Sequence, residues 1–280
     1  MSPSDVPVAL VTGASSGIGR ATARRLASSG YHVVATVRSP ESEASVRGDG
    51  PTEVVRLDIA DENALRHVIS EVLSRLGRID VLVNNAGFAL VGAVEDLDRD
   101  HIRRQFEVNV FAAVQACREV LPSMRARRSG RIVNVSSLAG RVSVPMMGAY
   151  CASKFALEAF SDALRVETKP FGVHVSLVEP GPVVTEFQRN ALKASEDVLT
   201  SDSVYRPAYE SYLSGGFATS HGATAEQAAR TIHRAVSARR PRSRYRVRMR
   251  DSVATGFIQI IPRAGMDWIL SRWMDLDVVR

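Results

Sequence analysis

The chain has 280 residues and a mass of 30.4 kDa, which suits one large domain or two small ones. Hydrophobic residues form 45% and charged residues 24% of it, a globular balance that excludes disordered, collagen-like and coiled-coil proteins. The net charge of +6 comes from one basic segment at 239–250, so the rest of the chain gives no electrostatic reason to expect nucleic acid binding.

The cysteines, the histidines and the apolar segments indicate which kinds of site and which cellular compartment to expect. Cys117 and Cys151 stand alone without a CxxC, so we expect neither a disulfide framework nor a thiolate metal site. The six histidines lack metal-binding spacing, which predicts catalysis without a metal. The first ten residues lack the features of a secretory signal, and no apolar run is long enough to cross a bilayer. We therefore expect a cytoplasmic protein without a membrane span.

Short β-branched runs alternate along the chain with longer stretches of helical periodicity. The predicted strands cover Val8–Val11, His32–Val37, Glu53–Leu57, Val81–Asn84, Arg131–Val135, His174–Val178 and a shorter seventh near Tyr245–Arg248. The predicted helices cover Ile18–Ser28, Glu62–Leu76, Asp100–Arg127, Ala149–Thr168 and Ala225–Ala238. Segments 39–52 and 187–224 look irregular, and the second is long enough to be a mobile lid. This alternation predicts a single α/β domain with a parallel sheet and crossover helices.

A glycine-rich turn follows the first predicted strand. The sequence TGASSGIG at 12–19 comes after an apolar run and opens a helix. Glycines there allow a tight turn and a close backbone approach, and the helix N-terminus attracts a pyrophosphate. The spacing differs from GxGxxG, so an ordinary strand-to-helix turn is the alternative.

Tyr150 and Lys154 stand four residues apart on a predicted helix and so share one face. An adjacent cation favours a phenolate and lowers the pKa of the phenol, which would suit the pair to proton transfer. A chance surface pair is the alternative. The helix follows a strand that ends at Ser136 and Ser137, and the carboxyl end of a parallel strand normally faces the ligand crevice.

Six motifs then occur in one order and spacing: TGASSGIG at 12–19, NNAG at 84–87, Asn109 in VNV, the second serine of NVSS, YCASK at 150–154 and PGPVVT at 180–185. With them the sequence resembles the short-chain dehydrogenase/reductase family, closely from Val8 to Thr185 and loosely beyond. VVATVRS at 33–39 and the long tail are most similar to the hydroxysteroid and retinol dehydrogenase branch. The resemblance implies a Rossmann-like, doubly wound parallel sheet of about seven strands flanked by helices.

The resemblance implies four catalytic residues. Tyr150 would be the general acid that protonates the substrate oxygen, and Lys154 would lower its pKa and hold the nicotinamide ribose. Ser137 would hydrogen-bond the substrate carbonyl. Asn109 would keep a water in a proton relay through Lys154, and its alternative is a polar kink that satisfies its own helix backbone.

The resemblance also implies a set of cofactor contacts at the strand ends. Asp58 would contact the adenine amino group and Thr185 the nicotinamide carboxamide, whereas Asn84 is expected to be mainly structural. The full implied set is Gly13, Ser15, Ser16, Gly17, Ile18, Gly19, Arg38, Asp58, Ile59, Asn85, Ala86, Gly87, Tyr150, Lys154, Pro180, Gly181, Val183 and Thr185.

The end of the second strand bears on cofactor choice. Family members that prefer NAD place an acid there, which accepts bonds from ribose hydroxyls and repels a phosphate. This chain has Val37, followed by Arg38, whose guanidinium suits a ribose phosphate. We therefore expect NADP (NADPH) to be preferred over NAD, with a solvated Arg38 as the alternative.

Apolar side chains flank the motifs on the side expected to face substrate. The predicted substrate residues are Ser137, Val144, Met147, Tyr150 and Phe187, with Phe88, Leu90 and Met146 nearby. Core packing is the alternative for the methionines. The set predicts an apolar pocket. The resemblance to the hydroxysteroid and retinol dehydrogenase branch implies a bulky apolar ketone, aldehyde or alcohol, such as a steroid, retinoid or polyketide.

The tail departs from the family pattern. We expect residues 1–240 to form the NADP-binding catalytic domain, with a lid at 186–224, and 241–280 to extend it with a last strand and an amphipathic helix. Alternating arginines at 242–250 suggest a solvated edge-strand face, with binding to an acidic surface, headgroups or nucleic acid as the alternative. The helix carrying Met266, Ile269, Leu270 and Trp273 would close over substrate, contact a partner subunit or rest weakly on a membrane surface.

These expectations combine into an NADP-dependent oxidoreductase, a ketoreductase that transfers hydride between NADP(H) and a carbonyl or secondary alcohol. The resemblance implies a homodimer or homotetramer, and no nucleic acid partner is expected. The alternatives are a non-catalytic NADP-sensing or scaffolding protein on the same fold, or an epimerase or dehydratase of the family. The presence of all four implied catalytic residues disfavours the first, and the short chain with NNAG disfavours the epimerase branch.

Overall fold

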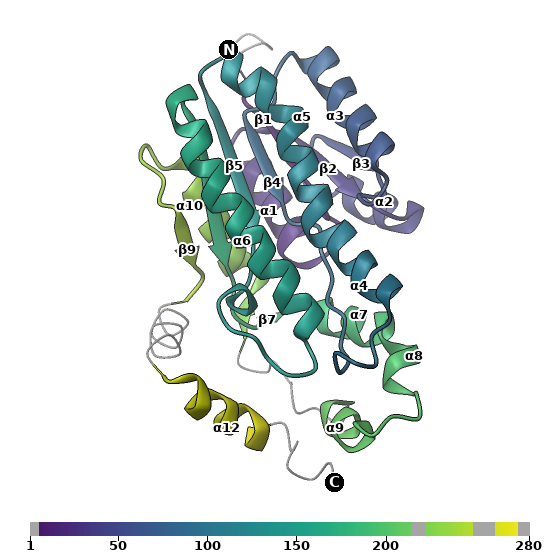
Figure 1. Ribbon diagram of the computed structural model, residues 1–280. Helices are drawn as coiled ribbons and strands as arrows, with labels where there is room; N and C mark the ends of the chain where they lie inside the picture. Colours follow the sequence, from purple (N-terminus) through teal and green to yellow (C-terminus); the bar gives the residue numbers. More distant parts are fainter. Residues whose placement is uncertain (1–5, 214–221, 249–260, 274–280) are drawn as a thin grey trace.

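A central parallel sheet organises the molecule. The computed structural model describes residues 6–213, 222–248 and 261–273. Seven strands pair in the order β3-β2-β1-β4-β5-β6-β9, and every pairing is parallel (Figure 1). The strands are β1 Val8–Val11, β2 His32–Val37, β3 Glu53–Arg56, β4 Val81–Asn84, β5 Gly130–Val135, β6 Val173–Glu179 and β9 Arg244–Arg246. The predicted doubly wound sheet of seven strands is confirmed.

Helices cover both faces of this sheet. On one face α3 (Glu62–Leu76) and α5 (Ala112–Ala126) bury Leu65, Ile69 and Val120 against the strands, with α6 (Gly148–Thr168) beside them (Figure 1). On the other face α1 (Gly17–Ser28) and α10 (Ala225–Ser237) bury Leu26 and Ile232. Strands covered on both faces are apolar throughout, which explains the unbroken valine and leucine runs.

The direction in which successive strands are added to the sheet reverses at one point, between β1 and β4. β1 pairs with β2 on one side and with β4 on the other, so the crossovers before and after this point run in opposite directions. Open α/β sheets bind their ligands at such a point, beside the carboxyl ends of the strands, which here are those of β1 and β4.

Segment 39–52, expected to be irregular, contains helix α2 (Pro40–Arg47). Ser39 caps it by accepting a hydrogen bond from the backbone N–H of Ser42 at 3.3 Å, and Pro40 occupies the first helical position. That start signal is present in the sequence, but the helix buries only Val46 and shows no apolar periodicity. The expectation of an irregular segment was wrong because this helix has a capping signal but no apolar stripe.

The long helix expected over Asp100–Arg127 is interrupted. It consists of α4 (Arg99–Phe106), one π-helical turn (Glu107–Phe111) and α5. A π-turn inserts one residue into an otherwise continuous helix. The insertion surrounds Asn109, which is buried.

The described part of segment 187–224, residues 187–213 and 222–224, is more ordered than expected. It holds three short helices, α7 (Phe187–Ala194), α8 (Glu196–Leu199) and α9 (Arg206–Ser211), and strand β8 (Ala223–Thr224), which pairs with β7 (Val183–Val184). Two buried bonds tie the helices to the loop after β4: Ser195 Oγ accepts from the N–H of Val91, and Tyr209 Oη from that of Ala93, both at 2.8 Å. Helices this short show too little periodicity to be predicted. Gly215, Gly216 and His221, part of the expected lid, lie outside the described residues.

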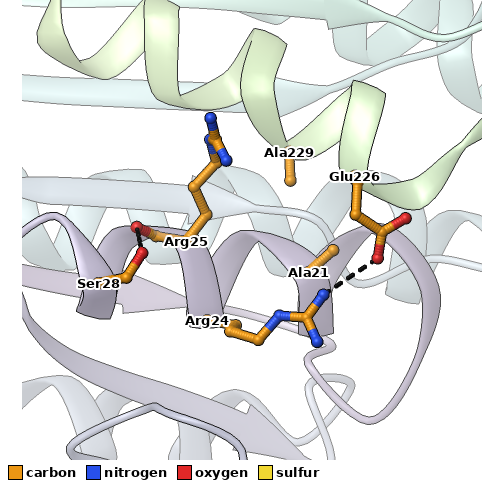
Figure 2. A pocket seen from close by; sticks show the side chains of 6 residues that line it. All are labelled: Ala21, Arg24, Arg25, Ser28, Glu226 and Ala229. Atoms are coloured by element: carbon orange, nitrogen blue, oxygen red, sulfur yellow. Dashed lines mark hydrogen bonds and ion pairs between the residues drawn. The ribbon is translucent and has the colours of Figure 1, made fainter.

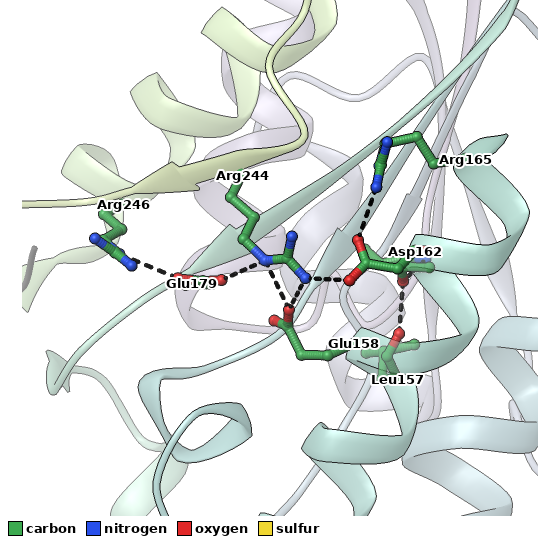
Figure 3. A network of polar contacts seen from close by, with 9 residues as sticks. Leu157, Glu158, Asp162, Arg165, Glu179, Arg244 and Arg246 are labelled. Atoms are coloured by element: carbon green, nitrogen blue, oxygen red, sulfur yellow. Dashed lines mark hydrogen bonds and ion pairs between the residues drawn. The ribbon is translucent and has the colours of Figure 1, made fainter. Parts of the chain in front are cut away.

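The arginine strand does not present the solvated face that the sequence suggested. Arg244 forms ion pairs with Glu158, Asp162 and Glu179, and Arg246 pairs with Glu179 (Figure 3). The Arg244 and Arg246 side chains are only 24% and 28% exposed. The prediction failed because the acids on α6 and β6 are remote in sequence. Met249 and Arg250 lie outside the described residues.

No helix in the described ranges is long and apolar enough to cross a membrane.

A shallow hollow between α1 and α10 is lined by Ala21, Arg24, Arg25, Ser28, Glu226 and Ala229 (Figure 2). There Arg24 donates to Glu226 at 3.1 Å, and none of the sequence-predicted site residues takes part. The candidate active site therefore lies elsewhere, at the strand ends.

Candidate active site

The turn between β1 and α1 is fixed by close backbone packing. Gly13 and Gly17 have positive φ angles of 67° and 54°. A Cβ at Gly13 would lie 2.7 Å from the Cα of Ala86, and one at Gly19 only 2.2 Å from the carbonyl oxygen of Gly13. Real Cβ atoms do not approach so closely, so both positions require glycine for packing alone.

The N-terminus of α1 is open to an anion. Its N-cap Ser16 has extended backbone and makes no side-chain cap, and no acid lies in the first turn. The first backbone N–H groups are therefore left for a ligand, and the helix dipole favours a negative one. Ser15, Ser16, Gly17 and Ile18 are half-buried around this turn. These residues fit the pyrophosphate of a dinucleotide.

Thr12 and Asn85 hold the turn against the loop after β4. Thr12 Oγ1 accepts from the backbone N–H groups of Asn85 and Ala86 at 3.0 and 3.1 Å. Asn85 Nδ2 donates to the carbonyl oxygens of Thr12 and Gly13, each at 3.0 Å. The Asn85 side chain is thus engaged in structure. Thr12 is the first residue of the glycine-rich motif, but the sequence analysis gave it no role in the site.

The other implied cofactor residues lie along the same edge. Arg38 is exposed directly after β2, and Asp58 is exposed after β3 with Oδ1 accepting from the N–H of Ala60 at 3.1 Å. After β6, Pro180 is buried and its carbonyl oxygen accepts from the N–H of Leu138 at 3.0 Å. Thr185 stands beside the start of α1, because a Cβ at Gly17 would lie 3.2 Å from its methyl group. Half-buried positions complete the edge: Ile59, Ala86, Gly87, Gly181 and Val183.

Tyr150 and Lys154 are buried side by side at the start of α6. They are 7% and 5% exposed, and Lys154 Nζ lies 5.9 Å from the centre of the Tyr150 ring. Lys154 Nζ donates to the carbonyl oxygen of Val135 at 2.9 Å, which ties it to the end of β5. Ser137 Oγ accepts from the N–H of Ala139 at 3.1 Å and is also within hydrogen-bonding range of the Tyr150 phenol.

Burial sets the charge states of this pair. Burial raises the pKa of Tyr150 to about 12, while its hydrogen bond with Ser137 acts in the opposite direction. Burial lowers the pKa of Lys154 to about 8, and the Glu158 carboxylate opposes that change. The expected lowering of the Tyr150 pKa by Lys154 is not found here, because the ammonium bonds Val135 and desolvation dominates. Tyr150 therefore holds its proton at neutral pH.

Asn109 links three parts of the site. Its Oδ1 accepts from the N–H of Phe88 at 3.0 Å, and its Nδ2 donates to Phe88 O at 2.9 Å and to Ser153 Oγ at 3.0 Å. Ser153 Oγ donates in turn to the carbonyl oxygen of Tyr150 at 2.7 Å. The side chain therefore bonds the loop after β4 and α6, instead of its own helix backbone.

Two supporting side chains and one structural amide complete this region. Gln105, which the sequence analysis missed, donates to Phe88 O at 2.7 Å and accepts from the N–H of Leu90 at 2.8 Å. Ser153 was also missed, although it lies within YCASK. Asn84 is buried and donates to Asn134 Oδ1 at 2.9 Å, in keeping with the structural role expected for it.

The predicted substrate residues differ in how close they come to Tyr150. The ring of Phe187, on α7, lies 5.8 Å from the Tyr150 ring. Met147 packs against the same apolar cluster as Tyr150, and the half-buried Val144 accepts from its N–H at 3.2 Å. Leu90 and Met146 are only 2% and 5% exposed, so both belong to the core. Met146 has a positive φ of 62°, an unfavourable conformation beside the candidate site.

Comparison with models of protein families identifies the family of this chain. The family model described as short chain dehydrogenase matches residues 7–196. The chain belongs to the short-chain dehydrogenase family. Among its curated relatives, the probable short-chain type dehydrogenase/reductase VdlC of Helicobacter pylori is 36% identical over 93% of this chain and 95% of that protein.

Two human relatives place this short-chain dehydrogenase near the hydroxysteroid and retinol branch. It is 39% identical to 17-beta-hydroxysteroid dehydrogenase type 1 over 71% of this chain and 63% of that protein. It is 42% identical to retinol dehydrogenase 8 over 65% of this chain and 61% of that protein. The resemblance to this branch is confirmed.

Solved structures of short-chain dehydrogenases share the fold. One from Streptomyces avermitilis is 33% identical, with a TM-score of 0.77 over 98% of this chain and 97% of that one. A metagenomic oxidoreductase in complex with NADP has 37% identity and a TM-score of 0.60 over 64% of this chain and 84% of its own. One from Burkholderia phymatum in complex with NAD has 26% identity and a TM-score of 0.77 over 91% of this chain and 94% of its own. The chain is thus an oxidoreductase of a family that binds nicotinamide cofactors.

Proposed function

We propose that the protein is an NADPH-dependent reductase of bulky apolar ketones or aldehydes. The observation that carries the proposal is the buried Tyr150, a phenol that keeps its proton. Ser137 hydrogen-bonds this phenol, and Lys154 Nζ lies 5.9 Å from the centre of its ring. A group that remains protonated at neutral pH is suited to give a proton to a substrate oxygen. This favours reduction as the working direction of a reversible reaction.

The residues divide the work at the substrate carbonyl. A nicotinamide cofactor, when bound, supplies the hydride. The Tyr150 hydroxyl donates its proton to the substrate oxygen, and the Ser137 hydroxyl donates a hydrogen bond to the same oxygen as negative charge develops there. Lys154, buried beside Tyr150 with its Nζ 5.9 Å from the ring centre, is placed to return a proton to the phenolate left on Tyr150. Asn109 holds Phe88 and Ser153 in place around the relay by which Lys154 returns a proton to Tyr150.

The preference for NADP rests on the end of β2. Val37 stands where an acid would repel a ribose phosphate, and Arg38 follows it, exposed and available to a phosphate. Among the described residues, no ion pair or hydrogen bond engages the Arg38 guanidinium. One solved relative holds NADP and another NAD, so the preference proposed here comes from Val37 and Arg38 alone.

Two further parts of the proposal concern substrate and assembly. Phe187 lies beside the Tyr150 ring and Met147 packs against the same apolar cluster, so the surroundings of Tyr150 are apolar. Relatives named for hydroxysteroid and retinol support an apolar substrate. We also propose a homodimer or homotetramer. Phe111, Phe155 and Phe160 are 49%, 42% and 48% exposed on the π-turn and α6, and exposed aromatic side chains are typical of subunit interfaces.

Tyr150→Phe tests the proposal. It removes the transferable proton and leaves the ring that packs against Phe187. We expect turnover of a bulky ketone with NADPH to fall on the order of 100-fold to 10,000-fold, while the dissociation constant for NADPH stays within about threefold. NADPH oxidation and cofactor fluorescence measure the two quantities. Tyr31→Phe, at the amino-terminal side of β2, is the matched control, and unchanged turnover in Tyr150→Phe would refute the assigned acid.

A further inference from the structure

One face of α6 carries a row of ionisable residues. Tyr150, Lys154, Glu158 and Asp162 are each four residues apart, so they lie one above another along the helix. The first two belong to the candidate active site. The other two continue the row toward strand β9, which lies at the edge of the sheet (Figure 1).

Arg244 joins this row to the end of the sheet (Figure 3). Its Nε and Nη2 donate to Glu158 Oε2 at 3.1 and 2.9 Å, and Nη2 also donates to Asp162 Oδ2 at 2.6 Å. On the other side its Nε lies 3.0 Å from Glu179 Oε1, and Arg246 Nε lies 3.2 Å from Glu179 Oε2. Helix α6 and strands β6 and β9 thus meet at one guanidinium.

Two of the three acids in this cluster are deeply buried, whereas the Asp162 side chain is 40% exposed. Glu158 is 5% and Glu179 0% exposed. Burial and the neighbouring Glu179 raise the pKa of Glu158, and Ser136 and Arg244 act in the opposite direction. Without Arg244, two carboxylates would share a dry site, and one of them would take up a proton.

Lys154 needs a buried negative charge for the same reason that Glu158 needs a positive one. Burial lowers the pKa of Lys154 to about 8, close to the pH at which an enzyme works, and Glu158 is the group that opposes the loss of its proton. Glu158 is one helical turn from Lys154 on the same face. Charges therefore alternate from Arg244 through Glu158 to Lys154.

We propose that Glu158 and Arg244 are positioning residues for the Tyr150 and Lys154 pair: Arg244 keeps Glu158 ionised, and the Glu158 carboxylate keeps Lys154 protonated. The role in catalysis rests on the proposed function, whereas the charge state of Lys154 does not. The family model matches residues 7–196, so Arg244 brings a residue from beyond the matched region into the working of the site.

The lysine content of the chain allows a direct test. Only three lysines occur, Lys154, Lys169 and Lys193, and the last two are exposed. In protein labelled with carbon-13 lysine, three Cε signals can be followed by NMR against pH and assigned with Lys169→Arg and Lys193→Arg. Glu158→Gln keeps the shape of the side chain and removes its charge. We expect the titration midpoint of Lys154 to fall by about one pH unit.

Matched variants separate positioning from a purely structural tether. Asp162→Asn removes an acid that also bonds Arg244 but lies two turns from Lys154, so the Lys154 midpoint should stay where it is. Arg244→Gln should lower the Lys154 midpoint as Glu158→Gln does, because Glu158 would then take up a proton and lose its charge. This variant on β9 also tests the proposal if Glu158→Gln fails to fold. Arg246→Gln, on the same strand, is its control. A Lys154 midpoint unchanged in both Glu158→Gln and Arg244→Gln would overturn the proposal.

Kinetics distinguishes this inference from the function on which it rests. If Lys154 must be protonated, kcat/KM for carbonyl reduction falls as pH rises through the Lys154 pKa, and this alkaline limb moves to lower pH in Glu158→Gln by the same amount as the NMR midpoint. Suppose that the Lys154 midpoint shifts in the variants but the wild type reduces no carbonyl. This result would refute the proposed function and leave the proposed link between the charges of Arg244, Glu158 and Lys154 standing. Turnover in the wild type with an unshifted midpoint in the variants would refute the inference alone.

Discussion

Along the edge of the sheet, the half formed by β1 and β4 and the half formed by β5 and α6 hold their ligand groups by different means. In the first half the site consists largely of backbone, packed at Gly13 and Gly19 and fastened by Thr12 and Asn85, all without charge. In the second half the working groups are the buried ionisable side chains of Tyr150 and Lys154, and Glu158 opposes the loss of the Lys154 proton.

The difference teaches where each half is vulnerable. A backbone cradle tolerates changes of pH but not an added atom, because its neighbours cannot move. A buried charged row tolerates modest changes of shape but not the loss of a counter-charge, because burial then decides the protonation state. Substitutions in the two halves should therefore fail in different ways.

The largest effect should come from adding a methyl group to the cradle. In Gly19→Ala the new Cβ meets Gly13 O at 2.2 Å and Asn85 Nδ2 at 2.4 Å, so the turn must shift. We expect a loss of about 1–3 kcal/mol in the free energy of unfolding and of about a hundredfold in NADPH-dependent rate. Denaturant unfolding and steady-state kinetics measure both. Gly48→Ala is the control, since no atom lies within 4 Å of its Cβ position. Equal losses in the two variants would contradict the claim that close backbone packing at Gly19 requires glycine.

A charge change at the adenosine end should have the next largest effect. Arg38→Asp replaces a cation beside the expected ribose phosphate with an anion, so NADPH affinity should fall about tenfold to a hundredfold. NADH affinity should hold or rise, because an acid at this strand end accepts bonds from ribose hydroxyls. Fluorescence titration with each cofactor checks the ratio. Arg103→Asp, exposed on α4, should change neither affinity, and an unchanged ratio in Arg38→Asp would make Arg38 a solvated residue.

The smallest effect should come from the apolar lining of the second half. Phe187→Ala removes the ring next to Tyr150 and replaces no ionisable side chain, so kcat/KM for a bulky apolar ketone should fall about tenfold. The affinity for NADPH and the pH profile should not change. Phe171→Ala is a matched control, because Phe171 is 40% exposed and Phe187 38%. A larger loss for a small ketone such as acetone than for a bulky one would contradict the assignment of Phe187 to the substrate.

Predictability from sequence followed the same division. The seven strands, the order of the motifs and the glycine turn were predictable because each rests on local patterns: apolar runs, spacing and turn residues. The packing of Gly19 against Gly13 lies within a few residues of the chain. Helix α2 was predictable too, from Ser39 and Pro40, had capping signals been weighed against the missing periodicity.

The features that sequence could not supply depend on distant partners. Arg244 looked like part of a solvated strand because Glu158 and Glu179 are 86 and 65 residues away in the chain. The raised pKa of Tyr150 follows from burial by a cluster that includes residues of the loop after β4 and of segment 187–224. Asn109 was recognisable by resemblance, but its partners Phe88 and Ser153 required the π-turn to be known.

The π-turn at Glu107–Phe111 acts as a change of phase between two helices that appear to the eye as one. Each residue of an α-helix advances by about 100°, so one inserted residue turns α4 relative to α5 by that angle. Ile102 of α4 can thus face the cluster that contains Tyr150, while Ala116 and Val120 of α5 face the sheet. The two helices can thereby pack against two different surfaces, and a change in the length of this turn would rotate one helix relative to the other.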